Sequence, residues 1–218
     1  MRRVSALVDF SRTEHETLWL STAGWYATRL QRIPGPARRI ALIGQAPHDS
    51  DLDLRIAMDA LNATALHVSS PGPREAPLSE LAEVSDLAIV WGRHAPQNCP
   101  LPVLSAGGDA GEPALTLAMV VTHILAGGSL DGAHVDLRGL PAGVQISLTE
   151  LALDFALTLH VGEDHPSPSL LDELAAEGMA GSVSTGPAAG EGQRLTTAEP
   201  SLAWRAAAWC ALLSTLAA

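Results

Sequence analysis

The sequence predicts an α/β fold in which parallel β-sheets are covered by helices. Short apolar segments of strand length alternate with segments of helical pattern along most of the 218 residues. The strand segments are continuous apolar runs, which is typical of parallel strands buried on both faces. Because strands and helices alternate, each pair of parallel strands is expected to be joined by a helical crossover.

The first half of the chain has the clearer elements. Ser11-Arg12-Thr13-Glu14 has the pattern of a capping box and begins a helix that we expect to run to about Gln31. The expected strands are 39–43, 65–68, 87–91 and 102–104, and the helices between them are 54–61 and 78–84. Pro113 stands in the favoured first turn of the next helix, 114–125. This helix is apolar nearly all round, so we expect it to be buried.

A weaker set of elements follows a predicted hinge at 129–132. The expected strands are 133–137, 159–161 and 181–184, and the expected helices are 144–157 and 169–177. Ser201 caps a last helix that extends to about Leu216. The weaker pattern indicates that the second half forms a smaller unit.

Composition excludes several classes of protein. Thirteen basic residues, all of them arginine, oppose 24 acidic ones and give a net charge of −11. An acidic surface repels phosphate backbones, so nucleic acid is not an expected partner. No apolar run is long enough for a membrane span, and Cys99 and Cys210 lack the CxxC spacing of a metal or redox site. We therefore expect a cytoplasmic protein without a membrane segment.

Five stretches resemble one known family when they are taken in order. Leu7-Val8-Asp9-Phe10-Ser11 is similar to its opening, Ala57–Leu61 to the helix after its phosphate loop, and Ser85–Val90 to its third strand. Pro102–Ser105 precedes its next motif, and Glu112–Gly132 reproduces its crossing helix with the Gly-x-Leu-x-Gly exit. The chain thus resembles the aspartate/ornithine carbamoyltransferases over most of its length.

The resemblance implies two Rossmann-like parallel-sheet lobes of carbamoyltransferase type. Residues 1–128 would form a domain like the carbamoyl-phosphate-binding one, on which the terminal helix, 199–218, packs back. Residues 129–198 would form a reduced second domain, like the amino-acid-binding one. The family also implies a homotrimer in which the first domains meet around a threefold axis.

The motifs that bind carbamoyl phosphate in this family are missing here. Where the family has Ser-Thr-Arg-Thr-Arg, this chain has Pro47-His48-Asp49-Ser50-Asp51, so both arginine positions carry aspartate. An aspartate beside a phosphate is repulsive by up to about 4 kcal/mol at intermediate dielectric. The family's arginine after the third strand falls on Trp91, and only Pro113 of its His-Pro-x-Gln motif remains. The loop at 69–77 is short and supplies no lysine.

A polar cluster nevertheless occupies the expected mouth of the site. His48, Asp49, Ser50 and Asp51 could form an altered ligand site for a cation or metal, since carboxylates and imidazole suit divalent ions. The simpler interpretation is a helix N-cap, in which Asp49 or Ser50 accepts from free N–H groups and the acidic charges complement the helix dipole.

Three further residues are candidates for ligand binding. Arg93 and His94 follow the third strand and could form an anion site or supply a general base, or could lie in a solvated loop. Glu112 could take part in catalysis or could be the N-cap before Pro113. We assign no catalytic residue with certainty, no metal ligand and no cofactor.

The remaining polar residues give weaker signals. His123, His134 and His160 lie within regular elements without HExxH spacing and are interpreted as structural. The segment 139–143 follows a strand but lacks the glycine spacing of a nucleotide loop.

The function predicted from these features is that of a catalytically silent carbamoyltransferase homologue, a pseudoenzyme. It would act as a scaffold or regulatory partner, for example of an active carbamoyltransferase, or would bind a different small molecule in the cleft between the lobes. The first use predicts exposed apolar surface outside the threefold contact, and the second predicts a closed polar cleft. The alternative is an active transferase with an altered substrate, in which Arg93, His94 and the backbone after Asp51 bind the anion. A Rossmann-like oxidoreductase or methyltransferase would rest on the alternating pattern alone.

Overall fold

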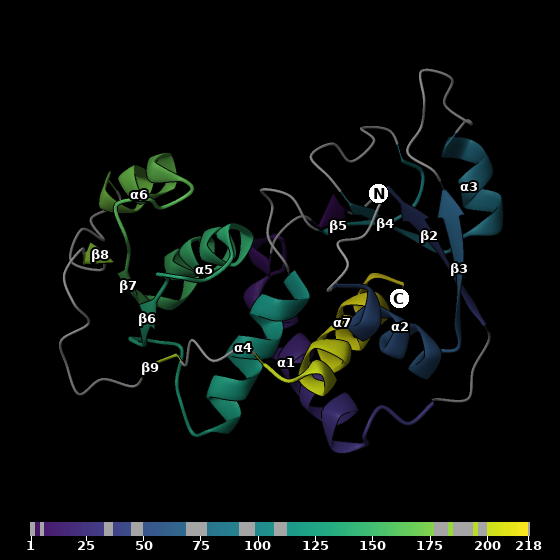
Figure 1. Ribbon diagram of the computed structural model, residues 1–218, viewed down its shortest axis with the longest axis horizontal. Coiled ribbons are helices and arrows are strands. Elements are labelled where there is room, and N and C mark those ends of the chain that lie inside the picture. Colours follow the sequence, from purple (N-terminus) through teal and green to yellow (C-terminus); the bar gives the residue numbers. More distant parts are fainter. Residues whose placement is uncertain are drawn as a thin grey trace.

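The molecule contains two parallel β-sheets that lie side by side, with helices packed between and around them (Figure 1). The computed structural model describes residues 3–4, 7–32, 37–44, 50–68, 78–91, 99–106, 113–176, 183–184, 194–195 and 200–217. Every described strand pair is parallel, so the predicted α/β class is confirmed.

The first sheet has five strands in the order β1-β5-β4-β2-β3. Their bounds are β1 Arg3–Val4, β2 Arg38–Ile43, β3 Ala63–Val68, β4 Leu87–Trp91 and β5 Val103–Ala106. The central strands pair in register, with Ile43 opposite Val90 and Trp91 opposite Ala106. Their carboxyl ends therefore lie together at one edge of the sheet.

Helices cover both faces of this sheet, as the continuous apolar strands predict. Leu87, Ile89 and Trp91 belong to the large core on one face, which includes residues of α1 (Arg12–Ala27), α2 (Ser50–Ala60), α4 (Pro113–Leu125) and α7 (Leu202–Leu216). Ala88 and Val90 point to the other face, where Leu81 of α3 (Leu78–Val84) packs. The period of two along β4 thus divides the core into two layers.

The second sheet is smaller, with four short strands in the order β8-β7-β6-β9. They are β6 His134–Asp136, β7 Thr158–His160, β8 Val183–Ser184 and β9 Arg194–Leu195. Val135, Leu159 and Leu195 bury one face against a core that includes α5 (Ala142–Phe155) and Leu174 of α6 (Pro168–Leu174). The small second sheet agrees with a reduced second lobe.

The C-terminal helix α7 returns to the first sheet. It packs against α1, α2 and α4, and its residues Ala206–Leu213 are buried (Figure 1). A small side chain at every third or fourth position of α7 allows α1 and α2 to approach it closely. At one such position the Cys210 thiol donates to the Ala57 carbonyl at 3.6 Å. None of the helices in the described part of the chain is long and apolar enough to cross a bilayer.

Most predicted elements lie within two or three residues of the observed ones, but the first helix is shorter than expected. It ends at Ala27 because Arg29 and Leu30 have left-handed backbone angles (φ 53° and 54°), and the Leu30 amide bonds back to Trp25. The 3₁₀ turn η1 (Leu7–Asp9) and the two-residue strands β1 and β9 were not predicted.

Candidate functional site

The topology of the first sheet puts its switch point between β2 and β4. The helix after β2, α2, lies on the face opposite to that of α3, which precedes β4. From β2 the chain passes to β3 on one side and then returns to β4 on the other, so the strand order reverses between β2 and β4. In open α/β sheets ligands bind outside the carboxyl ends of the strands at such a switch point. Gly44 directly follows β2 and Trp91 ends β4, so these are the described residues at the carboxyl ends of the two strands.

Gly44 and Trp91 are in close contact. Gly44 has φ +88°, and a Cβ atom there would lie 2.6 Å from the Trp91 carbonyl oxygen. The Trp91 side chain is only 8% exposed and packs in the large core together with Ala106 and Ala114. The last side chain of β4 is therefore an indole that points into the core.

The structure tests few of the predicted site residues. Ser50 and Asp51 lie in the first turn of α2, but the positions of their side chains are not described. His48, Asp49, Arg93, His94 and Glu112 lie outside the described residues. Pro113 is the first residue of α4, as predicted.

A buried ion pair that the sequence did not reveal joins the first turns of α2 to α7. Asp53 is 5% exposed, and its Oδ2 atom lies 3.4 Å from Nε of Arg205. Burial raises the pKa of the Asp53 carboxyl, while Arg205, the Leu54 amide and the Trp209 side chain oppose that rise. The partners are 152 positions apart in the sequence, so no local motif could have indicated them.

Polar groups also meet where η1 packs against α5. Within the described part of the chain, Glu150 Oε2 and Ser147 Oγ are buried without hydrogen-bond partners. Burial, and secondarily the charge of Asp9, raise the pKa of the Glu150 carboxyl. Beside them, His15 bonds through Nε2 to the Leu7 carbonyl at 2.7 Å, and its ring is 5.6 Å from that of Phe155.

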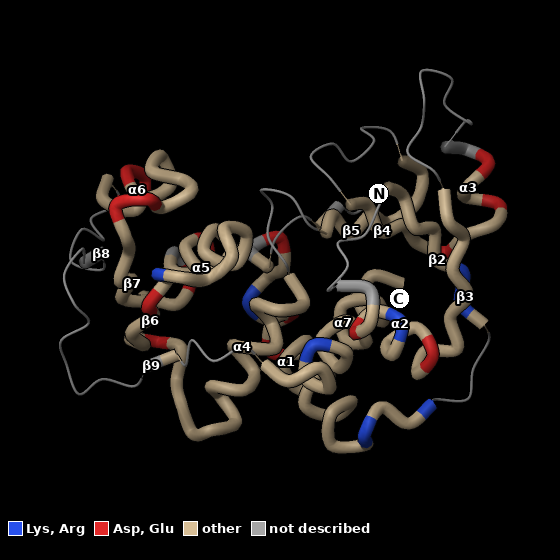
Figure 2. The backbone as a smooth tube through the Cα atoms, in the orientation of Figure 1, with Lys and Arg blue, Asp and Glu red and all other residues tan. Residues whose placement is uncertain are grey.

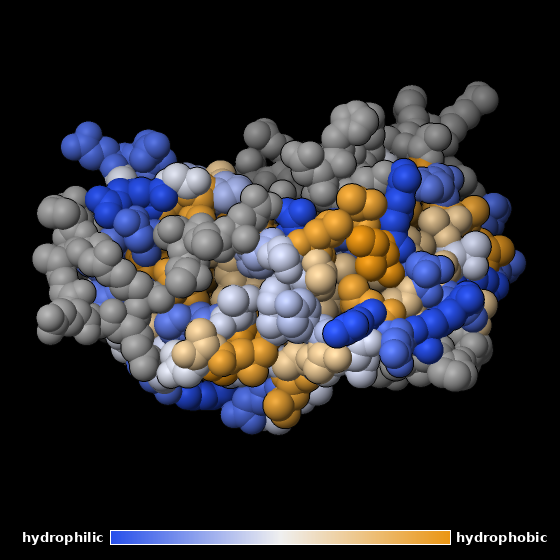
Figure 3. Space-filling model, turned by 60° about the horizontal axis from the view of Figure 1, so that its bottom comes forward, coloured by the Kyte–Doolittle hydropathy of each residue, from blue (hydrophilic) through white to orange (hydrophobic). Residues whose placement is uncertain are grey.

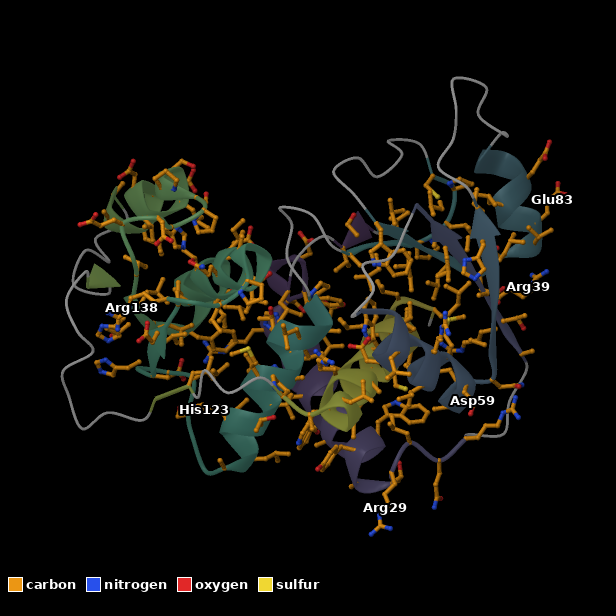
Figure 4. The ribbon with its side chains drawn as sticks, in the orientation of Figure 1. Arg29, Arg39, Asp59, Glu83, His123 and Arg138 are labelled. Atoms are coloured by element: carbon orange, nitrogen blue, oxygen red, sulfur yellow. The ribbon has the colours of Figure 1, made fainter. Side chains whose placement is uncertain are left out.

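The second sheet carries a histidine pair at its polar face. His134 Nδ1 and His160 Nε2 are 3.2 Å apart. The ring centroids are 5.5 Å apart and the planes differ by 21°, so the nitrogens face each other head-on, as in an N–H···N hydrogen bond. Arg138 donates to Asp136 at 2.6 Å and 2.8 Å, which lowers the pKa of Asp136 (Figure 4). Among the described residues no group of three or more His, Cys, Asp or Glu could hold a metal ion.

Comparison with solved structures identifies the architecture. Ornithine carbamoyltransferases from Burkholderia thailandensis and Thermus thermophilus both superpose with a TM-score of 0.70, at 14% and 17% identity, over 99% of this chain and 98% and 99% of theirs. Aspartate transcarbamoylase from Trypanosoma cruzi, in complex with N-(phosphonacetyl)-L-aspartic acid, superposes with a TM-score of 0.56 at 20% identity, over 81% of this chain and 66% of its own.

At the level of sequence the likeness is faint. No protein-family model matches the chain, and no curated protein is significantly similar to it. The superposition nevertheless extends over nearly the whole chain. The chain therefore has the fold of the ornithine and aspartate carbamoyltransferases.

Proposed function

We propose that this protein is a catalytically silent relative of the carbamoyltransferases that acts as a scaffold or regulatory partner. The observation that supports this most directly is the burial of Trp91 at the switch point of the first sheet. A dianion needs cationic forks and free N–H groups at this place. An indole supplies no positive charge there, and the apolar core around it would strip water from the anion.

The charges of α2 support the same proposal. Its first turn contains Asp51, and the buried Asp53 follows two residues later. Arg205 reaches this helix from α7, but its guanidinium already pairs with Asp53. A phosphate at the start of α2 would therefore meet negative charge without the arginines that ordinarily offset it.

The proposal includes a division of the chain into two domains and the assembly of the protein into a trimer. Residues 1–128 with the helix at 199–218 form the first domain, and residues 129–198 form the reduced second domain. Contacts of α7 with α1, α2 and α4 support the return of the last helix to the first domain. We further propose a cytoplasmic homotrimer that associates with a protein partner, such as an active carbamoyltransferase.

Calorimetric titration with carbamoyl phosphate and, separately, with inorganic phosphate tests the loss of the anion site. We expect no saturable heat with either anion, and no carbamoyl transfer to ornithine or aspartate under conditions in which an active carbamoyltransferase gives both signals. Micromolar binding of carbamoyl phosphate that Arg93→Ala abolishes would overturn the proposal in favour of a rebuilt anion site.

The mass of the protein in solution tests the assembly separately. A homotrimer predicts three times the mass of one chain by light scattering after gel filtration. Addition of an active carbamoyltransferase would then move the protein into a larger mixed species. A protein that stays monomeric and ignores the active enzyme would contradict the scaffold role, whatever the titration shows.

A further inference from the structure

The outward face of α1 is uncharged over three helical turns. From Thr17 to Thr28 the sequence TLWLSTAGWYAT contains no acidic or basic residue, and Figure 2 shows no charged residue along the corresponding part of the helix. Besides Arg12 and Tyr26, the exposed positions of α1 repeat at helical spacing and form one stripe, which we call the α1 stripe: Thr13, Glu16, Thr17, Leu20, Gly24 and Ala27. In a chain with a net charge of −11, such a face on a surface helix requires a physical reason.

Two positions in the middle of the α1 stripe have complementary shapes. Leu20 is the most exposed large hydrophobic residue among those described, with 76% of its surface open. Gly24 lies one turn later on the same side, and a Cβ atom built there would meet nothing within 4 Å. A protruding side chain thus lies next to a place where a second helix can approach the backbone closely. Figure 3 shows that hydrophobic patches lie between hydrophilic ones on the underside of the molecule.

A twofold axis that passes midway between Leu20 and Gly24 would place Leu20 of each copy opposite Gly24 of the other. In an isologous contact, residue i of one copy touches residue j of the other, and j touches i. With antiparallel helices, each Leu20 would pack over Gly24 of the second copy, and each Thr17 would face Ala27. The small residues on both sides would allow close packing of the helices.

The charges at the two ends of the stripe agree with this arrangement. Glu16 lies six residues before the centre of the contact, and Arg29 lies seven residues after it. At about 1.5 Å per residue along α1, an antiparallel copy brings each Glu16 to the end of the other copy's helix, close after which Arg29 follows in the turn. Arg29 points away from the body of its own chain (Figure 4), and neither residue forms an ion pair within the described part of the chain.

We propose that the α1 stripe is an isologous contact between two copies of this chain, with Leu20 opposite Gly24 and Glu16 opposite Arg29. Strongly acidic copies repel each other over most of their surface, so a charge-free face flanked by opposite charges favours self-association over other contacts. Because one helix pair buries less than a standard interface, the association is expected to be in the micromolar range. It would double the mass of whatever species the protein otherwise forms.

Sedimentation velocity from micromolar to submillimolar concentration tests the contact. The wild type is expected to reach twice the mass of Leu20→Gln and Gly24→Gln at the same concentration. Gly24→Gln has space in the single chain and improves helix propensity, so its loss of association cannot be attributed to unfolding. Leu125→Gln is the matched control, because Leu125 is also exposed and lies at the end of α4. It should associate as the wild type does.

Charge reversal tests the antiparallel orientation. Glu16→Arg should weaken association several-fold, and addition of Arg29→Glu should restore it. Equal masses for the wild type and both α1 variants over the whole range would overturn the contact, as would an equal loss in Leu125→Gln. A double variant that does not recover would overturn the pairing of Glu16 with Arg29. None of these results depends on whether carbamoyl phosphate binds.

Discussion

Gly44 and Gly24 differ in what a side chain would meet at their positions. A methyl group at Gly44 would clash with the Trp91 carbonyl at 2.6 Å, and the left-handed φ of +88° disfavours any L-residue there. Gly24 has an ordinary helical backbone with open space around it. Gly44 is therefore required by its contact with the end of β4, whereas within a single chain Gly24 only weakens its helix.

This contrast predicts opposite effects of the same substitution. Gly44→Ala should lower the free energy of unfolding by about 2 kcal/mol, since strain in φ adds to the clash. Gly24→Ala should raise it by about 0.5–1 kcal/mol through helix propensity. Urea denaturation at one protein concentration measures both. Equal effects of the two substitutions would show that the approach of Gly44 to Trp91 is not a constraint.

At the level of single residues, the sequence showed which residue type stands at each position of the family's motifs, but not whether its side chain is buried. It placed Trp91 where the carbamoyltransferases have an arginine, but the continuous apolar run of β4 could not show that the indole is buried in the large core. Nothing in the sequence distinguishes Asp53, because a carboxylate in the first turns of a helix ordinarily lies in solvent and complements the helix dipole. Its burial depends on α7, which no local pattern brings next to α2.

Among the elements, α2 and α7 are held together by the Asp53–Arg205 pair within an otherwise apolar contact. Removal of Arg205 would leave Asp53 buried without its cationic partner. We expect Arg205→Met to lower the free energy of unfolding by roughly 3 kcal/mol at neutral pH. Combination with Asp53→Asn should recover most of that loss, because no buried charge then remains uncompensated.

An exposed ion pair on the same domain provides the control for that measurement. Arg39 and Asp86 lie 3.4 Å apart with side chains 51% and 40% exposed, so Arg39→Met should change stability by no more than about 1 kcal/mol (Figure 4). If Arg205→Met is as mild as Arg39→Met, the pair does not connect the two helices energetically.

Element boundaries were predictable where the chain carries its own stop signals. The helix α3 and the strand β4 have the predicted bounds, since Pro77 precedes the helix and a polar pair separates it from the strand. The first helix was predicted too long because its end depends on left-handed angles at Arg29 and Leu30, which neither residue type indicates. Strands of two residues, such as β1 and β9, are too short to show any period.

For the whole molecule, the order of elements was more informative than any single motif. Identities of 12–20% leave few shared residues, but the succession of strands and helices agrees with the carbamoyltransferase fold over most of the chain. Fold is set by this pattern of burial, whereas activity depends on a few side chains at one edge of a sheet. A chain can therefore keep this architecture whatever side chains stand at that edge.

The junction between the lobes carries an unfavourable charge that pH should reveal. Glu150 lies on α5 and faces η1 of the first lobe, where burial and Asp9 raise the pKa of its carboxyl. The folded protein thus binds this proton more tightly than the unfolded chain. The favourable contribution is complete below the ordinary pKa of glutamate, about 4.3, and is lost as pH rises through the folded-state pKa.

Glu150→Gln should therefore stabilise the protein at neutral pH by up to about 1 kcal/mol and should have little effect at acidic pH. Urea denaturation of the wild type and the variant, repeated at several pH values from acidic to neutral, measures the difference in their free energies of unfolding. Asp154→Asn removes a carboxylate from an exposed position of the same helix and is the matched substitution outside the contact between the lobes. A gain for Glu150→Gln that grows toward low pH would reverse the sign required by a raised pKa and would mean that the ionised carboxylate stabilises the contact between the lobes.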